Sequence, residues 1–545
     1  MKSFFALCAV LFLFSCTNAL KEHQNSPDDY AVIPKPLELT PENGRFLIDD
    51  NISIHGNESL SNEMVFLNEI LLNNTGQSAA ILSEGAPSKT SKNIFLGLKP
   101  EMDGDESYTV DVGFDAIHIE GKTAKGVFHG IQTLRQLIPI SPATDAPFNA
   151  AYTIPAVKIM DQPAFSYRGM HLDVGRHFFP VPFIKKYIDI LSLHKMNTFH
   201  WHLTEDQGWR IEIKKYPKLT SVGSQRKETI LEKNFNPYIG DETPYGGFYT
   251  QEEIKEVVAY ATTKHITIIP EIELPGHSLA AIAAYPNLGN TKTVHEVGTR
   301  WGVYDAIYAP SEETFSFLED VLTEVIALFP SKLIHIGGDE APKKEWNESA
   351  LATEVMEREQ LKDAHELQSY FIQRIEKFLN SKGRNIIGWD EILEGGLAPN
   401  ATVMSWRGTQ GGIDAANQKH NVIMTPGSHC YFDHYQVDKE FQKDEPLAIG
   451  GFTSVEKVYS YNPIPEELSE DKHKYILGAQ GNVWTEYITT PEHVEYMVLP
   501  RLTALSEVLW TSKPQKDWSD FKQRLNRLKS RYEHLNYNYA PHLFQ

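Results

Sequence analysis

The chain has 545 residues, which is too long for one ordinary domain and suits two or three. With 41% hydrophobic and 11% aromatic residues it can bury sizeable cores, which excludes wholesale disorder. A net charge of −21 without any Lys/Arg-rich stretch excludes a nucleic-acid binder and disfavours a polyanionic substrate, so we expect a neutral small molecule or neutral polymer as the ligand.

The first sixteen residues, MKSFFALCAVLFLFSC, predict an export signal. Lys2 precedes an apolar run that is too short for a stable membrane anchor. The run ends in LFSC at 13–16 before a polar stretch, which resembles the lipidation box of bacterial lipoproteins; an ordinary secretory signal is the alternative. We therefore expect an outer-membrane lipoprotein, periplasmic or at the cell surface, anchored through Cys16, with residues 17–30 as a flexible tether. Processing at Cys16 leaves only Cys430, so no internal disulfide is expected.

Residues 31–160 predict a small α+β domain. Alternating apolar and polar residues in NIFLGL, SYTVDVG and AIHIEGK indicate strands. The stretch GVFHGIQTLRQLI at 126–138 places apolar residues at helical spacing. Pro155 and Pro163 mark the end of this domain.

From residue 166 strand-like and helix-like stretches alternate. The predicted strands are 167–174, 196–203, 266–274, 332–338, 385–392, 402–408, 421–427 and 475–484. Amphipathic stretches such as EEIKEVVAYATTKH lie between most of them. Eight such units over 161–511 predict a (β/α)8 TIM barrel, with a doubly wound open sheet as the competitor, and 512–545 predicts a C-terminal helix and tail.

Nearly every predicted barrel strand ends in polar or aromatic residues, and the chemistry of a barrel lies at these ends. Such residues are Arg168, Asp173, Arg176, His200, His202, Glu205, Asp206, Glu271, Glu273, His277, Asp339, Glu340, Trp389, Trp406, Tyr431, Asp433, Trp484 and Glu486. Indole faces stack on the C–H faces of a sugar ring, and carboxylates accept hydrogen bonds from hydroxyls. This pattern favours a sugar-binding basin.

The adjacent acids Asp339 and Glu340 follow the strand-like run KLIHIGG. Neighbours in a regular strand point to opposite faces, but Gly337 and Gly338 allow the backbone to leave that geometry, so both acids could reach the barrel mouth. Their proximity predicts a raised pKa for one of them.

A metal site is the rival interpretation of these polar residues. His200 and His202 share one face of their strand, as zinc ligands can. No H-x-x-x-H helix and no Cys cluster supports it, so we expect neither a metal nor a cofactor.

Seven motifs occur in a specific order: RGMHLDVGRHF, HWHLTEDQGWR, PEIELPGH, HIGGDE, GWDE, MSWRG and NVWTE. Together they resemble glycoside hydrolase family 20, the β-N-acetylhexosaminidases, over about residues 31–510. The resemblance implies exo-hydrolysis of terminal GlcNAc or GalNAc from an oligosaccharide or glycoconjugate. In this family the substrate's own acetamido group attacks C1, and configuration is retained through an oxazolinium ion.

The resemblance also implies roles for the site residues. Glu340 is expected to be the general acid, protonated near neutral pH, and Asp339 the ionised acceptor of the acetamido N–H. Substrate contacts are expected from Arg168 (3- and 4-hydroxyls), Glu486 (4-hydroxyl), Asp433 (6-hydroxyl), Tyr431 (acetamido carbonyl) and the indoles of Trp389, Trp406 and Trp484.

Supporting positions behind the acid pair are expected at Asp206, Glu273 and His277, with Glu205 as the alternative to Asp206. The third-strand acid is often Asp in this family, whereas here it is Glu273. Alternative functions are a lacto-N-biosidase-like release of disaccharides, a non-catalytic glycan-binding lipoprotein and a metal-dependent hydrolase. Some relatives pair through barrel faces, so a homodimer stays open.

Overall fold

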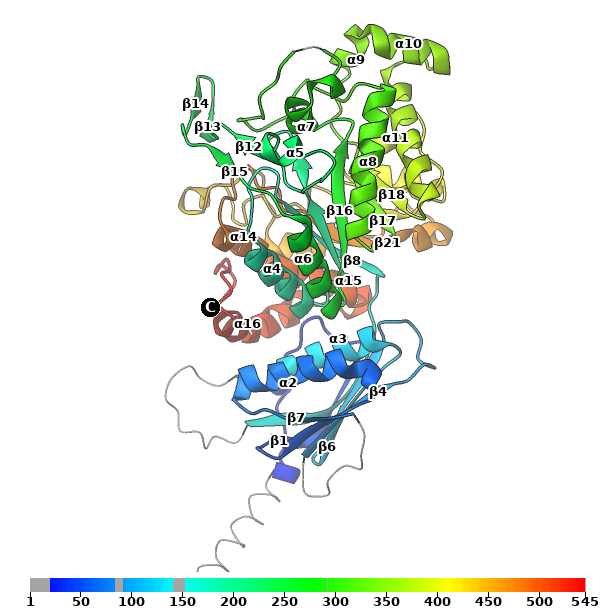
Figure 1. Cartoon of the computed structure of the whole chain (residues 1–545). Coiled ribbons are helices and arrows are strands. Elements are labelled where there is room, and N and C mark those ends of the chain that lie inside the picture. Colours follow the sequence, from blue (N-terminus) through cyan, green and yellow to red (C-terminus); the bar gives the residue numbers. More distant parts are fainter. Residues whose placement is uncertain (1–19, 84–91, 141–151, 292, 545) are drawn as a thin grey trace, which may run out of the picture. The chain divides into compact units, whose positions relative to one another are not determined.

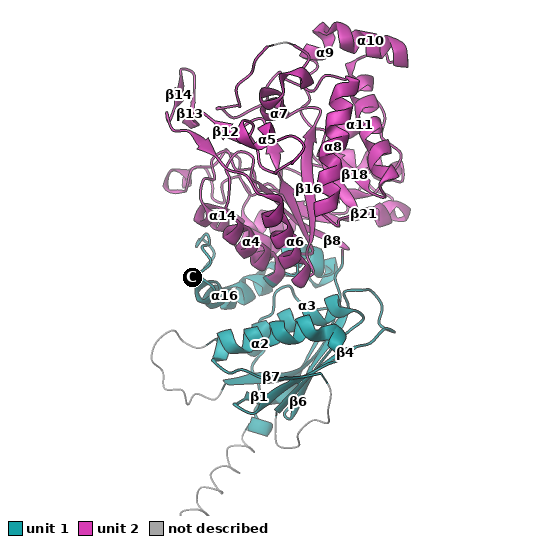
Figure 2. Ribbon diagram, viewed as in Figure 1, with its two compact units in different colours: residues 1–164, 193–195, 506–545 teal, residues 165–192, 196–505 magenta. Residues whose placement is uncertain are grey.

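The structure, a computed structural model, describes residues 20–83, 92–140, 152–291 and 293–544. The predicted signal and the first residues of the predicted tether lie outside these ranges. Two compact units make up the chain: residues 1–164, 193–195 and 506–545 form the first, and 165–192 and 196–505 the second (Figure 2). In the described residues no helix combines the length and the apolarity needed to cross a bilayer.

The first unit contains a seven-stranded mixed sheet with helices α2 and α3 on one face (Figure 1). Its strands, in spatial order, are β1 (Glu38–Ile48), β7 (Tyr152–Asp161), β5 (Tyr108–Val112), β6 (Ala116–Gly121), β4 (Lys92–Leu98), β2 (Ile52–His55) and β3 (Ala80–Leu82). The helices are α2 (Ser61–Thr75) and α3 (Ala124–Leu137). Strands β4, β5 and β6 and helix α3 confirm the elements that the sequence predicts in this region. The alternation of apolar and polar residues in β5 and β6 arises because every second side chain faces the core under the helices.

Two further segments belong to this unit. Part of the predicted tether is folded onto β1, since Asn25 Nδ2 donates to the carbonyl oxygens of Glu42 and Gly44 at 2.9 Å and Tyr30 is buried. The tether prediction therefore needs correction for these residues. The C-terminal helix α16 (Trp518–His534) is held by Arg524, whose Nη1 donates to Val32 O at 2.9 Å.

The second unit is a closed parallel barrel of eight strands, as the sequence predicts (Figure 1). In order around the barrel, the strands are β16 (Thr267–Leu274), β17 (Leu333–Gly337), β18 (Asn385–Trp389), β19 (Thr402–Ser405), β20 (Val422–Met424), β21 (Ile476–Gly481), β8 (Tyr167–Asp173) and β9 (Thr198–His202). Each lies within its predicted range. Strands β8 and β9 are buried along their whole length because helices cover the outer face and side chains fill the interior.

The helices that alternate with these strands include α4 (Val181–Leu193), α6 (Gln251–Thr263), α8 (Glu312–Leu328), α11 (Ala364–Ser381), α12 (Gln410–Asn417), α14 (Pro491–Val498) and α15 (Arg501–Trp510). Their starts follow capping rules: Thr250 accepts from Glu253 N while Glu253 accepts from Thr250 N, a capping box for α6. The sequence stretch 493–510 forms two helices rather than one, since Pro500 has no N–H to continue a helical ladder.

Candidate active site

A cavity of about 340 Å³ lies at the carboxyl end of the barrel strands. Residues that follow or end all eight strands line it: Arg176 (β8), Glu205 (β9), His277 (β16), Asp339 and Glu340 (β17), Trp389 (β18), Trp406 (β19), Tyr431 and Asp433 (β20), and Trp484 and Glu486 (β21). His434 and residues 449–451 complete the lining. The cavity thus brings together both predicted catalytic acids, all three predicted indoles and the predicted Tyr431, Asp433, Glu486 and His277.

Arg168 does not line this cavity, which corrects the sequence interpretation. It is the second residue of β8, at the amino end of the strand, and its Nη1 donates to Phe165 O at 2.9 Å. Arg176, which follows the carboxyl end of the same strand, takes the place expected of Arg168. Its guanidinium carbon lies 5.1 Å above the Trp484 ring, and its Nη2 lies 3.1 Å from Glu205 Oε2.

The backbone around the acid pair departs from strand geometry as the two glycines predict. Strand β17 ends at Gly337, and Gly337, Gly338 and Glu340 have φ values of 66°, 94° and 42°. Only glycine adopts such values without strain, so the non-glycine Glu340 is held there by its surroundings. As a result both Asp339 and Glu340 face one cavity.

The pKa values of the two acids move in opposite directions. Burial raises the pKa of Asp339 to about 6, against the pull of His277. A hydrogen bond from His277 lowers the pKa of Glu340 by more than burial raises it. One raised pKa was predicted, but the pKa of Glu340 is lowered rather than raised, because His277 lies 3.5 Å from Glu340 Oε2 and favours its ionised form.

His277 is the centre of a carboxylate cluster. Its Nδ1 donates to Glu205 Oε1 at 2.7 Å and lies 3.2 Å from Asp206 Oδ2, while Nε2 faces the acid pair. Burial lowers the pKa of His277, but Glu205 and the neighbouring hydrogen bonds raise it well above its ordinary value. The sequence analysis offered Asp206, with Glu205 as the alternative, as a supporting position behind the acid pair. In the structure Glu205 lines the cavity, and Asp206 lies behind it and accepts from Leu279 N at 2.9 Å.

Glu273 lies behind the cavity wall and over Gly337. A methyl group added at Gly337 would stand 1.6 Å from Glu273 Oε2, so this glycine makes room for the longer acid. Both carboxylate oxygens are buried without a protein hydrogen-bond partner. Burial and the charge of Asp339 raise the pKa of Glu273 well above its ordinary value, which favours a neutral carboxyl group.

Aromatic rings form the rest of the wall. The rings of Trp406 and Tyr431 are stacked with centroids 6.2 Å apart, and those of Trp389 and Trp484 are 5.7 Å apart. The Trp406 indole is fixed by Glu391, whose Oε2 accepts from Nε1 at 2.9 Å. Rings held in this way offer flat apolar faces at little entropic cost on binding.

Several carboxylate oxygens around the cavity are buried without a protein donor: Asp339 Oδ1, Asp433 Oδ1 and Glu486 Oε2. Burial raises the pKa of both Asp433 and Glu486. Unpaired buried acceptors cost free energy unless a ligand supplies donors. A ligand rich in O–H and N–H groups meets that demand.

Some lining residues escaped the sequence interpretation. Arg176 is part of the motif RGMHLDVGRHF, and its position just after the predicted strand could have indicated that it lies at the cavity end. His434 and the loop of Ile449, Gly450 and Gly451 follow no motif, so only the folded chain shows them.

Several His and carboxylate groups are close enough to share a metal ion, including His277, Asp339 and Glu340, and His171, His202 and Glu271. These donors already face one another as imidazole–carboxylate contacts, which a metal would have to displace. A larger cavity of about 550 Å³ lies in the first unit; its lining includes three arginines beside the acids Asp28 and Asp29 but no indole.

Comparison with known proteins agrees with the geometry. "Glycosyl hydrolase family 20, catalytic domain" matches residues 165–513, and "Glycosyl hydrolase family 20, domain 2" matches residues 29–162. A beta-hexosaminidase of Porphyromonas gingivalis is 46% identical over 540 residues, which are 98% of this chain and 67% of that protein. One of Vibrio furnissii is 39% identical over 76% of this chain and 67% of its own length.

Among solved structures, a GH20 exo-β-N-acetylglucosaminidase from Vibrio harveyi in complex with N-acetylglucosamine superposes with a TM-score of 0.81 at 32% identity. The match covers 94% of this chain and 78% of that one. The order of motifs, the barrel with its preceding domain and these matches agree, and the chain belongs to glycosyl hydrolase family 20.

Proposed function

We propose that the chain is an exo-acting, retaining β-N-acetylhexosaminidase that removes terminal GlcNAc or GalNAc from the non-reducing end of a glycan or glycoconjugate. The observation that carries the proposal is the adjacent pair Asp339 and Glu340 facing one cavity walled by indoles. Family membership and the unpaired acceptors of the wall support it.

In the first chemical step the acetamido oxygen of the bound sugar attacks C1 while the bond from C1 to the leaving oxygen breaks. Asp339, ionised, accepts the acetamido N–H and stabilises the positive charge that develops on the oxazolinium ion. The attack is intramolecular, and such pre-organisation is worth about 7–11 kcal/mol when the geometry is right. In the second step water attacks C1 and the acetamide is restored.

Glu340 moves the proton in both steps. His277 beside it favours the ionised form of Glu340, since the pKa of His277 is raised and that of Glu340 lowered. The Glu340 side chain is 42% exposed, so a bound sugar would remove water from it. Desolvation raises the pKa of Glu340 and favours the neutral acid, which gives its proton to the leaving oxygen and later takes one from water.

The other wall residues bind and orient the sugar. Arg176, rather than Arg168, donates to the 3- and 4-hydroxyls, and Glu486 and Asp433 accept from the 4- and 6-hydroxyls through oxygens that have no protein donor. Tyr431 donates to the acetamido carbonyl. Trp389, Trp406 and Trp484 enclose the acetyl methyl group and the sugar face.

Turnover of aryl β-GlcNAc and β-GalNAc glycosides tests the proposal. We expect release of the aryl group with the β-anomer as the first sugar product, and competitive inhibition by a thiazoline mimic of the cyclic intermediate. Equal turnover of an aryl β-glucoside, which lacks the acetamido group, would contradict the proposal.

We also propose that the protein is exported and attached to the outer membrane through a lipid on Cys16. The support is the short apolar run that ends in LFSC before a polar stretch.

A further inference from the structure

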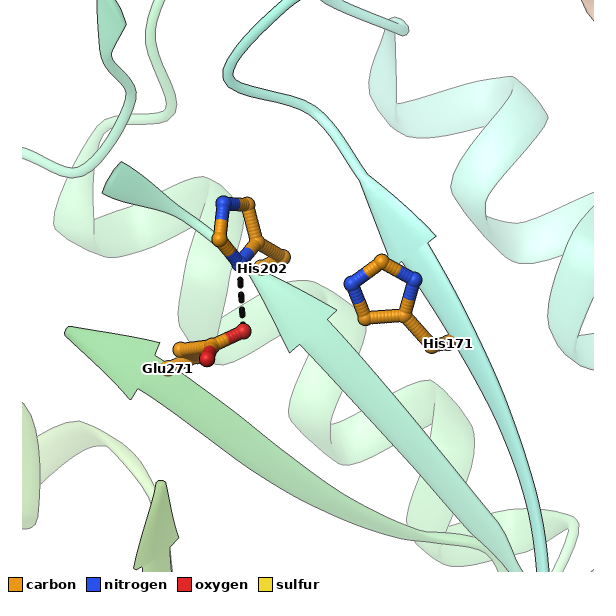
Figure 3. A group of neighbouring side chains, drawn as sticks. All are labelled: His171, His202 and Glu271. Atoms are coloured by element: carbon orange, nitrogen blue, oxygen red, sulfur yellow. Dashed lines mark hydrogen bonds and ion pairs between the residues drawn. The ribbon is translucent and has the colours of Figure 1, made fainter. Parts of the chain in front are cut away.

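Glu271 of β16, a carboxylate that has no role in the proposed reaction, lies inside the barrel beneath the cavity. Its Oε1 accepts from Trp389 Nε1 at 2.9 Å, and its Oε2 accepts from His202 Nδ1 (Figure 3). His335 Nδ1 lies 2.7 Å from Oε1 and His200 Nε2 lies 3.0 Å from Oε2. A single buried carboxylate is thus surrounded by the nitrogens of four ring side chains.

The strand geometry of the barrel produces this cluster. Residues 200 and 202 share one face of β9 because side chains alternate along a strand. Glu271 pairs in register with His202 on one side and with His335 on the other, so all three point into the barrel. The His200 and His335 rings are stacked with centroids 4.3 Å apart. His171 on β8 packs beside His202 with ring centroids 5.5 Å apart, and Figure 3 marks no hydrogen bond or ion pair between it and the His202–Glu271 pair.

The central contact is an ion pair. Both ring nitrogens of His202 face carboxylates, Nδ1 toward Glu271 and Nε2 toward Glu205 at 3.2 Å. Burial lowers the pKa of His202, but these carboxylates raise it to about 10, so the ring is charged. Burial raises the pKa of Glu271, and the surrounding imidazoles bring it well below its ordinary value.

The cluster connects two parts of the cavity wall. On one side Glu271 fixes the indole of Trp389, which is almost fully buried and whose ring lies 4.9 Å from that of His335. On the other side His202 holds Glu205, which in turn binds His277 behind the acid pair. A change in Glu271 therefore reaches the acetyl-binding wall directly.

We propose that Glu271 is a positioning residue that fixes the Trp389 indole, through its N–H, in the orientation that limits the N-acyl pocket to an acetyl group. This inference rests on the proposed function of Trp389 as part of that pocket. Specificity for the acyl group then depends on a carboxylate that never touches the sugar.

Glu271→Gln tests this role because glutamine keeps the size and changes the hydrogen bonding. Its single amide oxygen can accept from Trp389 or from His202, so one of these donors faces an amide N–H. Trp389→Phe removes the indole donor, and in that background the glutamine oxygen is free to serve His202. The effects of the two substitutions should therefore not multiply.

The measurement compares kcat/KM for aryl N-acetyl- and N-propionyl-glucosaminides. One extra methylene in a closed pocket costs about 10- to 200-fold, which we expect for the wild type. Glu271→Gln should lower kcat/KM for the N-acetyl substrate by about 10²-fold, as for other small misplacements, and reduce the acetyl preference by about tenfold. Glu271→Gln/Trp389→Phe should show no larger loss of preference than Trp389→Phe alone.

Asp161→Asn is the matched control, because Asp161 is also a buried carboxylate that accepts from an indole, Trp510 Nε1, at 3.0 and 2.9 Å and pairs with Lys195 at 3.3 Å. These residues belong to the first unit and do not line the cavity. Both variants should lower the melting temperature, but Asp161→Asn should keep the wild-type acyl preference.

Three results would overturn the inference: an unchanged acyl preference in folded Glu271→Gln, fold-changes that multiply in the double variant, or a stoichiometric metal ion in the wild type that Glu271→Gln lacks. Failure of the proposed function is distinct, since then Trp389→Phe itself would leave the acyl preference unchanged.

Discussion

At the scale of single residues, the ionisation of Asp339 sets the pH range of the reaction. Asp339 must be charged to accept the acetamido N–H, and burial raises its pKa to about 6. We therefore expect kcat/KM for an aryl N-acetylglucosaminide to rise as the pH increases through about 6. A profile measured between about pH 4 and 8 checks this. An acidic limb near the ordinary pKa of aspartate would contradict the role.

The same raised pKa predicts a cost in stability. A carboxyl group that holds its proton more tightly when folded stabilises the fold at low pH, and this stability is lost as pH rises from the unfolded pKa of about 3.9 to the folded value. Asp339→Asn should therefore melt at a higher temperature than the wild type above pH 6, because only the wild type carries the buried charge there. The difference should vanish at acidic pH, and equal melting temperatures at neutral pH would argue against a buried, charged Asp339.

Glu340 should show its role through the leaving group. Glu340→Gln cannot donate a proton, so kcat/KM for an alkyl or sugar aglycone should fall about 10²–10⁴-fold. A dinitrophenyl leaving group needs little protonation, so the rate of bond breaking for a dinitrophenyl glycoside should fall much less. Equal losses for both aglycones, measured by pre-steady-state release, would remove Glu340 from the acid role.

At the scale of elements, the end of β17 decides whether the acid pair faces the cavity. Gly337→Ala would place a methyl group 1.6 Å from Glu273 Oε2 in a backbone with φ 66°. Gly383→Ala is the matched control, because Gly383 has φ 73° and open space around its added carbon. Gly383→Ala should lose about 1 kcal/mol of stability from backbone strain, and Gly337→Ala should lose more, because its methyl group also displaces Glu273; urea unfolding measures both.

Only Gly337→Ala should also lose activity, since Glu273 has to move and its carboxyl group interacts electrostatically with Asp339. We expect its kcat/KM to fall by about 10²-fold or more. Wild-type activity in a folded Gly337→Ala variant would show that the space at this glycine does not position the acids.

The sequence predicts the barrel better than the domain before it, for physical reasons. Barrel strands such as β8 and β16 are almost continuously buried, and the helices between them are amphipathic, so strand-like and helix-like stretches alternate clearly along the sequence. Strand β1 has an irregular burial pattern and α2 carries apolar residues on several faces, so neither gives a clear periodicity. Both are stabilised by the sheet that they join rather than by local pattern.

The site shows the same division. Sequence order is enough to predict Asp339, Glu340 and the indoles, because each ends or follows a strand. Arg168 and Arg176 flank one strand, and only the direction of β8 in the closed barrel shows that Arg176 is at the cavity end. Likewise the raised pKa of His277 depends on Glu205, which approaches from another strand.

At the scale of the whole molecule, the site is self-contained within the second unit. All residues that line the cavity belong to 165–192 or 196–505. The lipid anchor proposed at Cys16 belongs to a segment outside the described residues, and nothing in the proposed reaction requires it. Attachment and catalysis should therefore be separable by substitution.

Cys16→Ser tests this separation. If Cys16 carries the lipid, the wild type should label with radioactive palmitate and partition into the detergent phase of a Triton X-114 extract, whereas Cys16→Ser should do neither. Its kcat and KM on a soluble aryl glycoside should equal those of the wild type after solubilisation, because the cavity lies among residues of the second unit. A wild-type protein that is unlabelled and water-soluble would instead indicate an ordinary secretory signal, and a Cys16→Ser protein that stays in the detergent phase would place the membrane contact elsewhere in the chain.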